Sequence, residues 1–71
     1  MLTMHQCCTA ILQSAHDKAV GWALGYARHG LSCEGEEARV QALYILNGIT
    51  LWRGPMAKQV RTSLKSIAKG N

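Results

Sequence analysis

The stretch from Arg53 to Asn71 constrains the fold most, because two helical periodicities run through it at once. The basic residues from Lys58 onward and the large apolar residues from Met56 onward each recur three or four positions apart, and no acidic residue interrupts them. At about 100° per residue, the cations after Arg53 fall within an arc of roughly 80°, and the apolar residues fall within a separate arc of similar width. The basic set is Arg53, Lys58, Arg61, Lys65 and Lys69, and the apolar set is Met56, Val60, Leu64 and Ile67. This pattern predicts an amphipathic helix with one side for a core and one for an anionic partner.

The length of the chain limits the size of the fold to which that helix belongs. Seventy-one residues make at most a single domain, residues 1–71. Hydrophobic residues are 48% of the chain, which is enough to fold. Domains below roughly 70–80 residues usually need disulfides, a metal, regular helix packing or self-association. A pocket of several hundred Å³ needs walls that a few short helices rarely provide, so we expect a protein that is not an enzyme.

Cysteine usage predicts a reducing compartment. Cys7, Cys8 and Cys33 are odd in number, and two of them are neighbours that cannot easily bond to each other. Residues 1–12 lack the basic start of a signal peptide, and the longest apolar run, 42–46, is far too short to span a membrane. We therefore expect a cytoplasmic protein with no membrane contact.

Two His and Cys pairs have spacings that suit a metal. His5 and Cys8 are three apart, and His29 and Cys33 are four apart. No zinc signature surrounds either pair, and we expect Gly30 to break the helix between His29 and Cys33. The thiols then behave as small hydrophobic groups, and we expect neither a metal nor another cofactor.

An all-α fold of three helices is predicted. Thr3 and Gln6 form a capping box ahead of a long periodic segment, which predicts a first helix over about 4–29. The His29-Gly30-Leu31 sequence then predicts a helix end with Gly30 in the left-handed conformation.

The second predicted helix begins after Ser32 and ends near Trp52. It is apolar nearly all round, so we expect it to be buried on several sides as the central helix. Gly54 and Pro55 separate it from the third helix, which is predicted over about 55–68.

Two glycines four residues apart suggest a close helix contact. Gly21 and Gly25 weaken the first helix, and such a pair usually means that another backbone comes near. The contact is either with the second helix of the same chain or with another copy of the chain, through Gly21, Gly25, Trp22 and Tyr26. The small size favours self-association, and we expect a homodimer.

Trp52 and Arg53 admit two interpretations. They form either an exposed anchor pair for a partner, or a plug in which Trp52 closes the bundle and Arg53 binds terminal carbonyls.

The charge is unevenly distributed. The net charge is +4, yet residues 1–52 contain three cations and four anions and have a net charge of −1. This asymmetry indicates either a Lys-rich helix that serves solubility or a surface for an anionic partner, which is an acidic protein, nucleic acid or an anionic membrane, and we expect no membrane partner. The third helix has few groups for reading base edges, so contact with nucleic acid would be non-specific.

Several short segments resemble small accessory proteins encoded by phages and prophages. They span roughly residues 34–68 and comprise Leu43-Tyr44-Ile45-Leu46-Asn47, Trp52-Arg53-Gly54, Ala57-Lys58 and Val60-Arg61. The resemblance implies action in a bacterial host cell by stoichiometric binding to a host protein, as an anti-CRISPR-like or similar inhibitor.

We expect, on these grounds, a helical protein-binding module. Its partner would be a host protein or protein complex with an acidic or nucleic-acid-binding surface, met by Arg53, Lys58, Arg61, Lys65 and Lys69. The alternative is a small basic protein that binds nucleic acid or regulates transcription.

Overall fold

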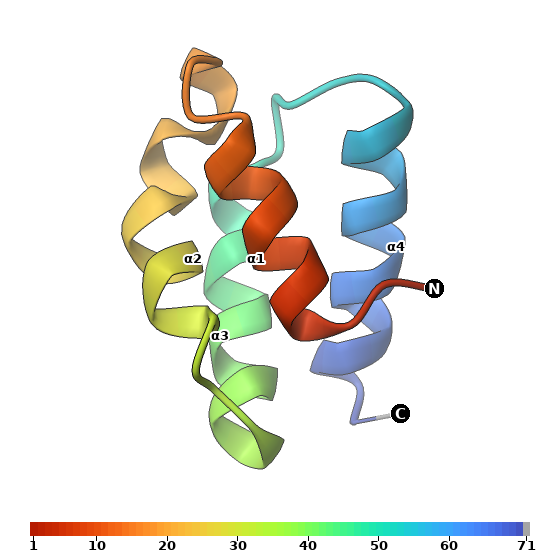
Figure 1. The fold of residues 1–71 in the computed structure, drawn as a ribbon. Coiled ribbons are helices and arrows are strands. Elements are labelled where there is room, and N and C mark those ends of the chain that lie inside the picture. Colours follow the sequence, from red (N-terminus) through yellow and green to blue (C-terminus); the bar gives the residue numbers. More distant parts are fainter. Residues whose placement is uncertain (71) are drawn as a thin grey trace.

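The computed structural model describes residues 1–70, and within that range the regular structure is all helical, with no strand. The elements are α1 (Met4–Gln13), the 3-10 helix η1 (Lys18–Ala23), α2 (Leu24–Gly30), α3 (Gly35–Gly48) and α4 (Pro55–Ala68). Helix α1 packs on α2 and α4, while α3 packs on α2, η1 and α4, which closes a ring around one core. Figure 1 shows α1 in front of α3, with α2 and α4 on either side. The predicted all-α class is confirmed, but the three-helix arrangement is wrong.

The predicted first helix over 4–29 is interrupted by a turn. Helix α1 ends at Gln13, and Asp17 has an extended backbone with φ −87° and ψ 121°. Its carboxylate oxygen Oδ1 accepts a hydrogen bond of 2.9 Å from the backbone N–H of Ala19. Aspartate bonds to nearby backbone more readily in a cap than inside a helix, so the continuous apolar periodicity is overridden at Asp17.

Two predicted helix boundaries are confirmed. The backbone N–H of Gln6 donates to Thr3 Oγ1 at 3.1 Å, and the backbone N–H of Thr3 donates to Gln6 Oε1 at 2.9 Å, which completes the capping box. The last helix begins with Pro55, where a missing N–H costs no intrahelical bond. Its bounds match the predicted range of 55–68.

The connection between α2 and α3 differs from the prediction. Gly30 is helical and buried instead of left-handed, and Ser32 donates its hydroxyl to the His29 carbonyl instead of capping a helix. The left-handed residue is Gly35, with φ +57°, at the first position of α3. A Cβ atom on Gly30 would lie 2.6 Å from Cys8 Sγ, so this glycine serves the close packing of α1 and α2.

Helix α3 is shorter and more exposed than predicted. It ends at Gly48, where a Cβ atom would lie 3.3 Å from the backbone of Ala23, so α3 and η1 approach closely at this glycine. Leu43 and Tyr44 are 51% and 47% exposed, which contradicts burial on several sides. The apolar surface of α3 therefore faces both the core and the solvent.

The core consists mainly of small and β-branched side chains. Its largest fully buried members are Ile11, Ile45, Ile49, Leu64, Val20 and Val60, together with Cys7 and Cys8. Trp52 closes one end of this core with 4% of its surface exposed, so the plug interpretation of Trp52 is confirmed. No helix within residues 1–70 is long and apolar enough to cross a membrane.

The thiols belong to the core and form no disulfide within the described range. Cys7, Cys8 and Cys33 are all free and buried. Burial raises the pKa of both Cys7 and Cys8 to about 11, and a hydrogen bond with Ser63 partly opposes this shift for Cys7. Both thiols are therefore neutral near pH 7.

The two glycines of α2 predict opposite responses to the same substitution. Gly30→Ala places its methyl group against a short, fully buried cysteine side chain, so we expect a loss of about 1–3 kcal/mol in unfolding free energy. Gly25→Ala meets no atom of its own chain within 4 Å and removes an exposed helical glycine, so for the monomeric chain, at high dilution, we expect a gain of about 0.4–1 kcal/mol. Urea denaturation followed by circular dichroism measures both. Equal effects of the two substitutions would contradict the packing described for Gly30.

The buried thiols predict a loss of stability at high pH. An unfolded chain ionises these thiols near pH 9, whereas the folded chain holds Cys7 and Cys8 neutral until about pH 11. Ionisation therefore favours the unfolded state as pH rises through this window, and the stabilisation is fully present below it. We expect the urea midpoint to fall between pH 9 and pH 11 more steeply than for the Cys7→Ala variant. Identical pH profiles for the two proteins would contradict this expectation.

Candidate functional site

The basic surface predicted from the sequence divides into two groups. Lys58 and Lys65 are exposed on the side of α4 opposite its buried residues, and Lys69 is exposed at the C-cap position directly after the helix. Within residues 1–70 the one ion pair joins Arg39 and Glu36 at 2.7 Å, on α3. The three lysines therefore present unneutralised positive charge, and we call them the lysine face.

The two arginines of the predicted basic set bind backbone carbonyls. The half-buried Arg61 donates from its guanidinium to the carbonyl of Trp52. Arg53 donates to the carbonyl of Thr50 at 2.9 Å. Both bonds fasten the loop between α3 and α4, which contains Trp52. Arg61 therefore helps to hold the fold, and the lysine face excludes it.

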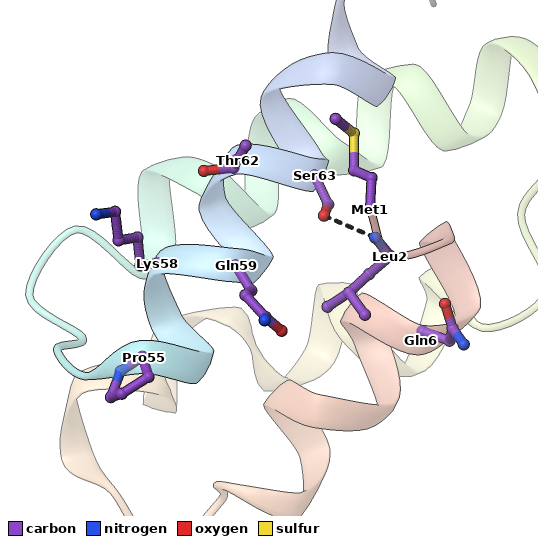
Figure 2. A pocket seen from close by; sticks show the side chains of 8 residues that line it. All are labelled: Met1, Leu2, Gln6, Pro55, Lys58, Gln59, Thr62 and Ser63. Atoms are coloured by element: carbon purple, nitrogen blue, oxygen red, sulfur yellow. Dashed lines mark hydrogen bonds between the residues drawn. The ribbon is translucent and has the colours of Figure 1, made fainter.

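A groove lies beside the lysine face, between the N-terminal segment and α4. It has a volume of about 670 Å³, which exceeds the expectation for so short a chain. Figure 2 shows Ser63 at its floor, where the hydroxyl oxygen accepts a hydrogen bond of 2.9 Å from the backbone N–H of Leu2. The groove is lined by Met1, Leu2, Gln6, Pro55, Lys58, Gln59, Thr62 and Ser63. In this set from the described residues, Lys58 has the only ionisable side chain, so the lining holds no pair of side chains for acid–base chemistry.

Exposed aromatic side chains lie on η1, α2 and α3. Trp22 is 87% exposed, and Tyr26 and Tyr44 are each a little less than half exposed. The rings of Tyr26 and Tyr44 pack with centroids 5.4 Å apart and planes inclined at 40°. We call Trp22, Tyr26 and Tyr44 the aromatic surface. The sequence pattern predicts burial for the helix that contains Tyr44, so the exposure of Tyr44 was not predicted. Gly48, four residues after Tyr44, marks the contact of α3 with η1 and was the available signal.

Gly21 and Gly25 lie beside the aromatic surface and face the solvent. A Cβ atom on either residue would meet nothing within 4 Å, so neither makes a close contact with another helix of this chain. The intrachain alternative for these glycines is therefore wrong. Self-association through Gly21, Gly25, Trp22 and Tyr26 stays a prediction.

The two His and Cys pairs end in different environments. Cys8 is fully buried, whereas His5 is exposed with its Nδ1 atom 3.4 Å from the carbonyl oxygen of Leu31, so this pair points apart. His29 and Cys33 instead come together, because hydrogen bonds from the Ser32 and Cys33 N–H groups to the His29 and Gly30 carbonyls continue the turn beyond Gly30. The expected helix end at Gly30 is found, but it does not separate His29 from Cys33.

Comparisons with known proteins give no information about the lysine face, the groove or the aromatic surface. The chain matches no family model, no curated protein and no solved structure.

Proposed function

We propose that the chain is a homodimeric binding module that acts stoichiometrically, without catalysis, on a host protein or protein complex. In this proposal the aromatic surface joins two copies, and the lysine face meets an acidic region of the partner. The observation that carries the proposal is the separation of the helices that bear most of these residues: Trp22 and Tyr26 lie on η1 and α2, and the lysines lie on or directly after α4. Helices α1 and α3 stand between α2 and α4 in Figure 1.

This placement assigns different tasks to the two surfaces. A positively charged side turns toward an acidic partner during encounter, because charge steers association. That orientation points α4 at the partner and α2 away from it, so one flat partner cannot meet both surfaces of a single copy. A second copy on the aromatic surface leaves both lysine faces of the pair exposed.

The aromatic surface has the properties of a self-association site. A tryptophan side chain removes about 200 Å² from water when it is buried, which is worth about 5 kcal/mol before the costs of association. Gly21 and Gly25 beside Trp22 leave open space in which a second backbone can approach closely. The same area on both copies would then form a two-fold interface.

The lysine face suits an acidic protein more than nucleic acid. Lys58, Lys65 and Lys69 are compact charges that attract carboxylates and phosphates alike. However, α4 contains no aromatic residue for stacking on bases and few groups for reading base edges. The inhibitory, anti-CRISPR-like role that the phage resemblance implies is compatible with occlusion of an acidic or nucleic-acid-binding surface.

The dimer is tested by mass in solution. We expect multi-angle light scattering to give the mass of two chains at micromolar concentration, and Trp22→Ala to give the mass of one chain. Leu51→Ala is the matched control, because Leu51 is 73% exposed but lies in the loop after α3, outside the aromatic surface. We expect this control to remain a dimer. A wild-type mass of one chain across the accessible range would overturn the assembly.

The partner is tested by photo-crosslinking in bacterial cells. A crosslinking residue replaces Thr62, which is exposed on α4 between the positions of Lys58 and Lys65, and Gln13 at the end of α1 provides the control. We expect nuclease-resistant adducts with a protein from position 62 only. Lys58→Glu, Lys65→Glu and Lys69→Glu together should abolish these adducts and leave the fold intact.

Nucleic acid is the alternative outcome of this test. If position 62 crosslinks to DNA or RNA instead, nucleic acid replaces protein as the proposed partner. The affinity for nucleic acid should then fall by about 0.9 log units per contacted phosphate for each tenfold rise in salt concentration.

A further inference from the structure

Three side chains with metal-binding atoms gather at the turn between α2 and α3. His29 lies in the last turn of α2, Cys33 in the connecting turn and Glu37 in the first turn of α3. Their imidazole nitrogen, thiol sulfur and carboxylate oxygen all lie within 4.8 Å of one another. The turn is the yellow-green connection at the lower left of Figure 1.

Backbone hydrogen bonds fix this arrangement. The N–H of Ser32 donates to the His29 carbonyl at 3.3 Å, and the N–H of Cys33 donates to the Gly30 carbonyl at 3.2 Å. These bonds prolong the helical path beyond α2, which places Cys33 one turn after His29. Gly35, with φ +57°, then redirects the chain so that α3 presents Glu37 to the same point.

We propose that His29, Cys33 and Glu37 bind a single Zn²⁺ ion. A mixed set of sulfur, nitrogen and oxygen ligands suits zinc, whereas magnesium and calcium prefer oxygen alone. Three protein ligands leave the fourth tetrahedral position to solvent, as in open zinc sites. This inference replaces the sequence-based expectation that the thiols hold no metal.

The side chains can reach zinc-binding distances without repacking the core. Tetrahedral zinc with bonds of 2.0–2.3 Å places its ligand atoms roughly 3.5 Å apart, so the present separations of up to 4.8 Å must shrink by about 1 Å. Cys33 is buried and held by the turn, whereas His29 and Glu37 are exposed and can rotate toward it. The ion can also enter from solvent along this exposed side.

Metal binding requires one proton to leave the site. The Cys33 thiol donates to the His29 carbonyl at 3.3 Å, and binding converts this thiol to a thiolate and releases its proton to solvent. The carbonyl keeps two other donors, the N–H and hydroxyl of Ser32, so it is not left unsatisfied. Burial and the neighbouring Glu37 carboxylate raise the pKa of Cys33, and a divalent cation relieves that repulsion between anions.

Cobalt spectroscopy tests the site in the untagged, reduced chain. We expect one equivalent of Co²⁺ to give the visible bands of tetrahedral cobalt and a near-ultraviolet charge-transfer band from a thiolate. Zn²⁺ should displace it, release one proton per ion and raise the melting temperature. Cys33→Ala should remove the charge-transfer band, and His29→Gln or Glu37→Gln should weaken binding roughly tenfold or more.

Matched controls separate this site from scattered surface binding. His16→Gln and Glu36→Gln remove an exposed histidine and a carboxylate beside Glu37 without touching the cluster, so both should bind cobalt like the wild type. Circular dichroism of each metal-free variant checks that it folds. A missing charge-transfer band in the wild type, or wild-type affinity in folded Cys33→Ala, would overturn the proposal.

Discussion

The close approach of backbones at two glycines is the constraint on which the bundle depends. Gly30 admits the Cys8 sulfur between α1 and α2, and Gly48 admits the backbone of Ala23 between η1 and α3. Short separations of this kind let small side chains of alanine, cysteine and valine fill much of the core, with Trp52 as its one buried aromatic residue among those described. Trp22, Tyr26 and Tyr44 lie outside this core.

Sequence patterns identified the parts of the fold in which local and tertiary preferences agree. The capping box at Thr3 and the proline start of α4 have local hydrogen-bond or backbone causes, and the alternation of apolar and basic residues in α4 matches its burial. Within residues 14–35, the turn and 3-10 helix that interrupt the predicted first helix and the start of α3 were not predicted, because local signals there conflict with the periodicity. Asp17 forms a cap within an apolar pattern that continues through it, and Gly30 is a packing residue in a position that resembles a helix end.

The residues of the candidate sites also divide into those that the pattern of a single helix predicts and those that depend on tertiary structure. The exposure of Lys58, Lys65 and Lys69 could be predicted, because it depends only on the sides of a single helix. The role of Arg61 could not, since it depends on a carbonyl nine residues earlier in a loop of irregular shape. The meeting of His29, Cys33 and Glu37 likewise depends on Gly30 staying helical and on Gly35 turning the chain. No spacing rule within one helix contains that information.

The bond between the Leu2 N–H and the Ser63 hydroxyl has a consequence for biosynthesis. This bond joins residues 61 positions apart, and α1 also packs on α4. The ring of helices therefore closes only when α4, which is synthesised after α1, α2 and α3, is present. Until α4 emerges, the core sites of Val60 and Leu64 are empty and the apolar sides of α1 and α3 are uncovered. A nascent chain that pauses before α4 therefore exposes apolar surface of the kind on which chaperones act.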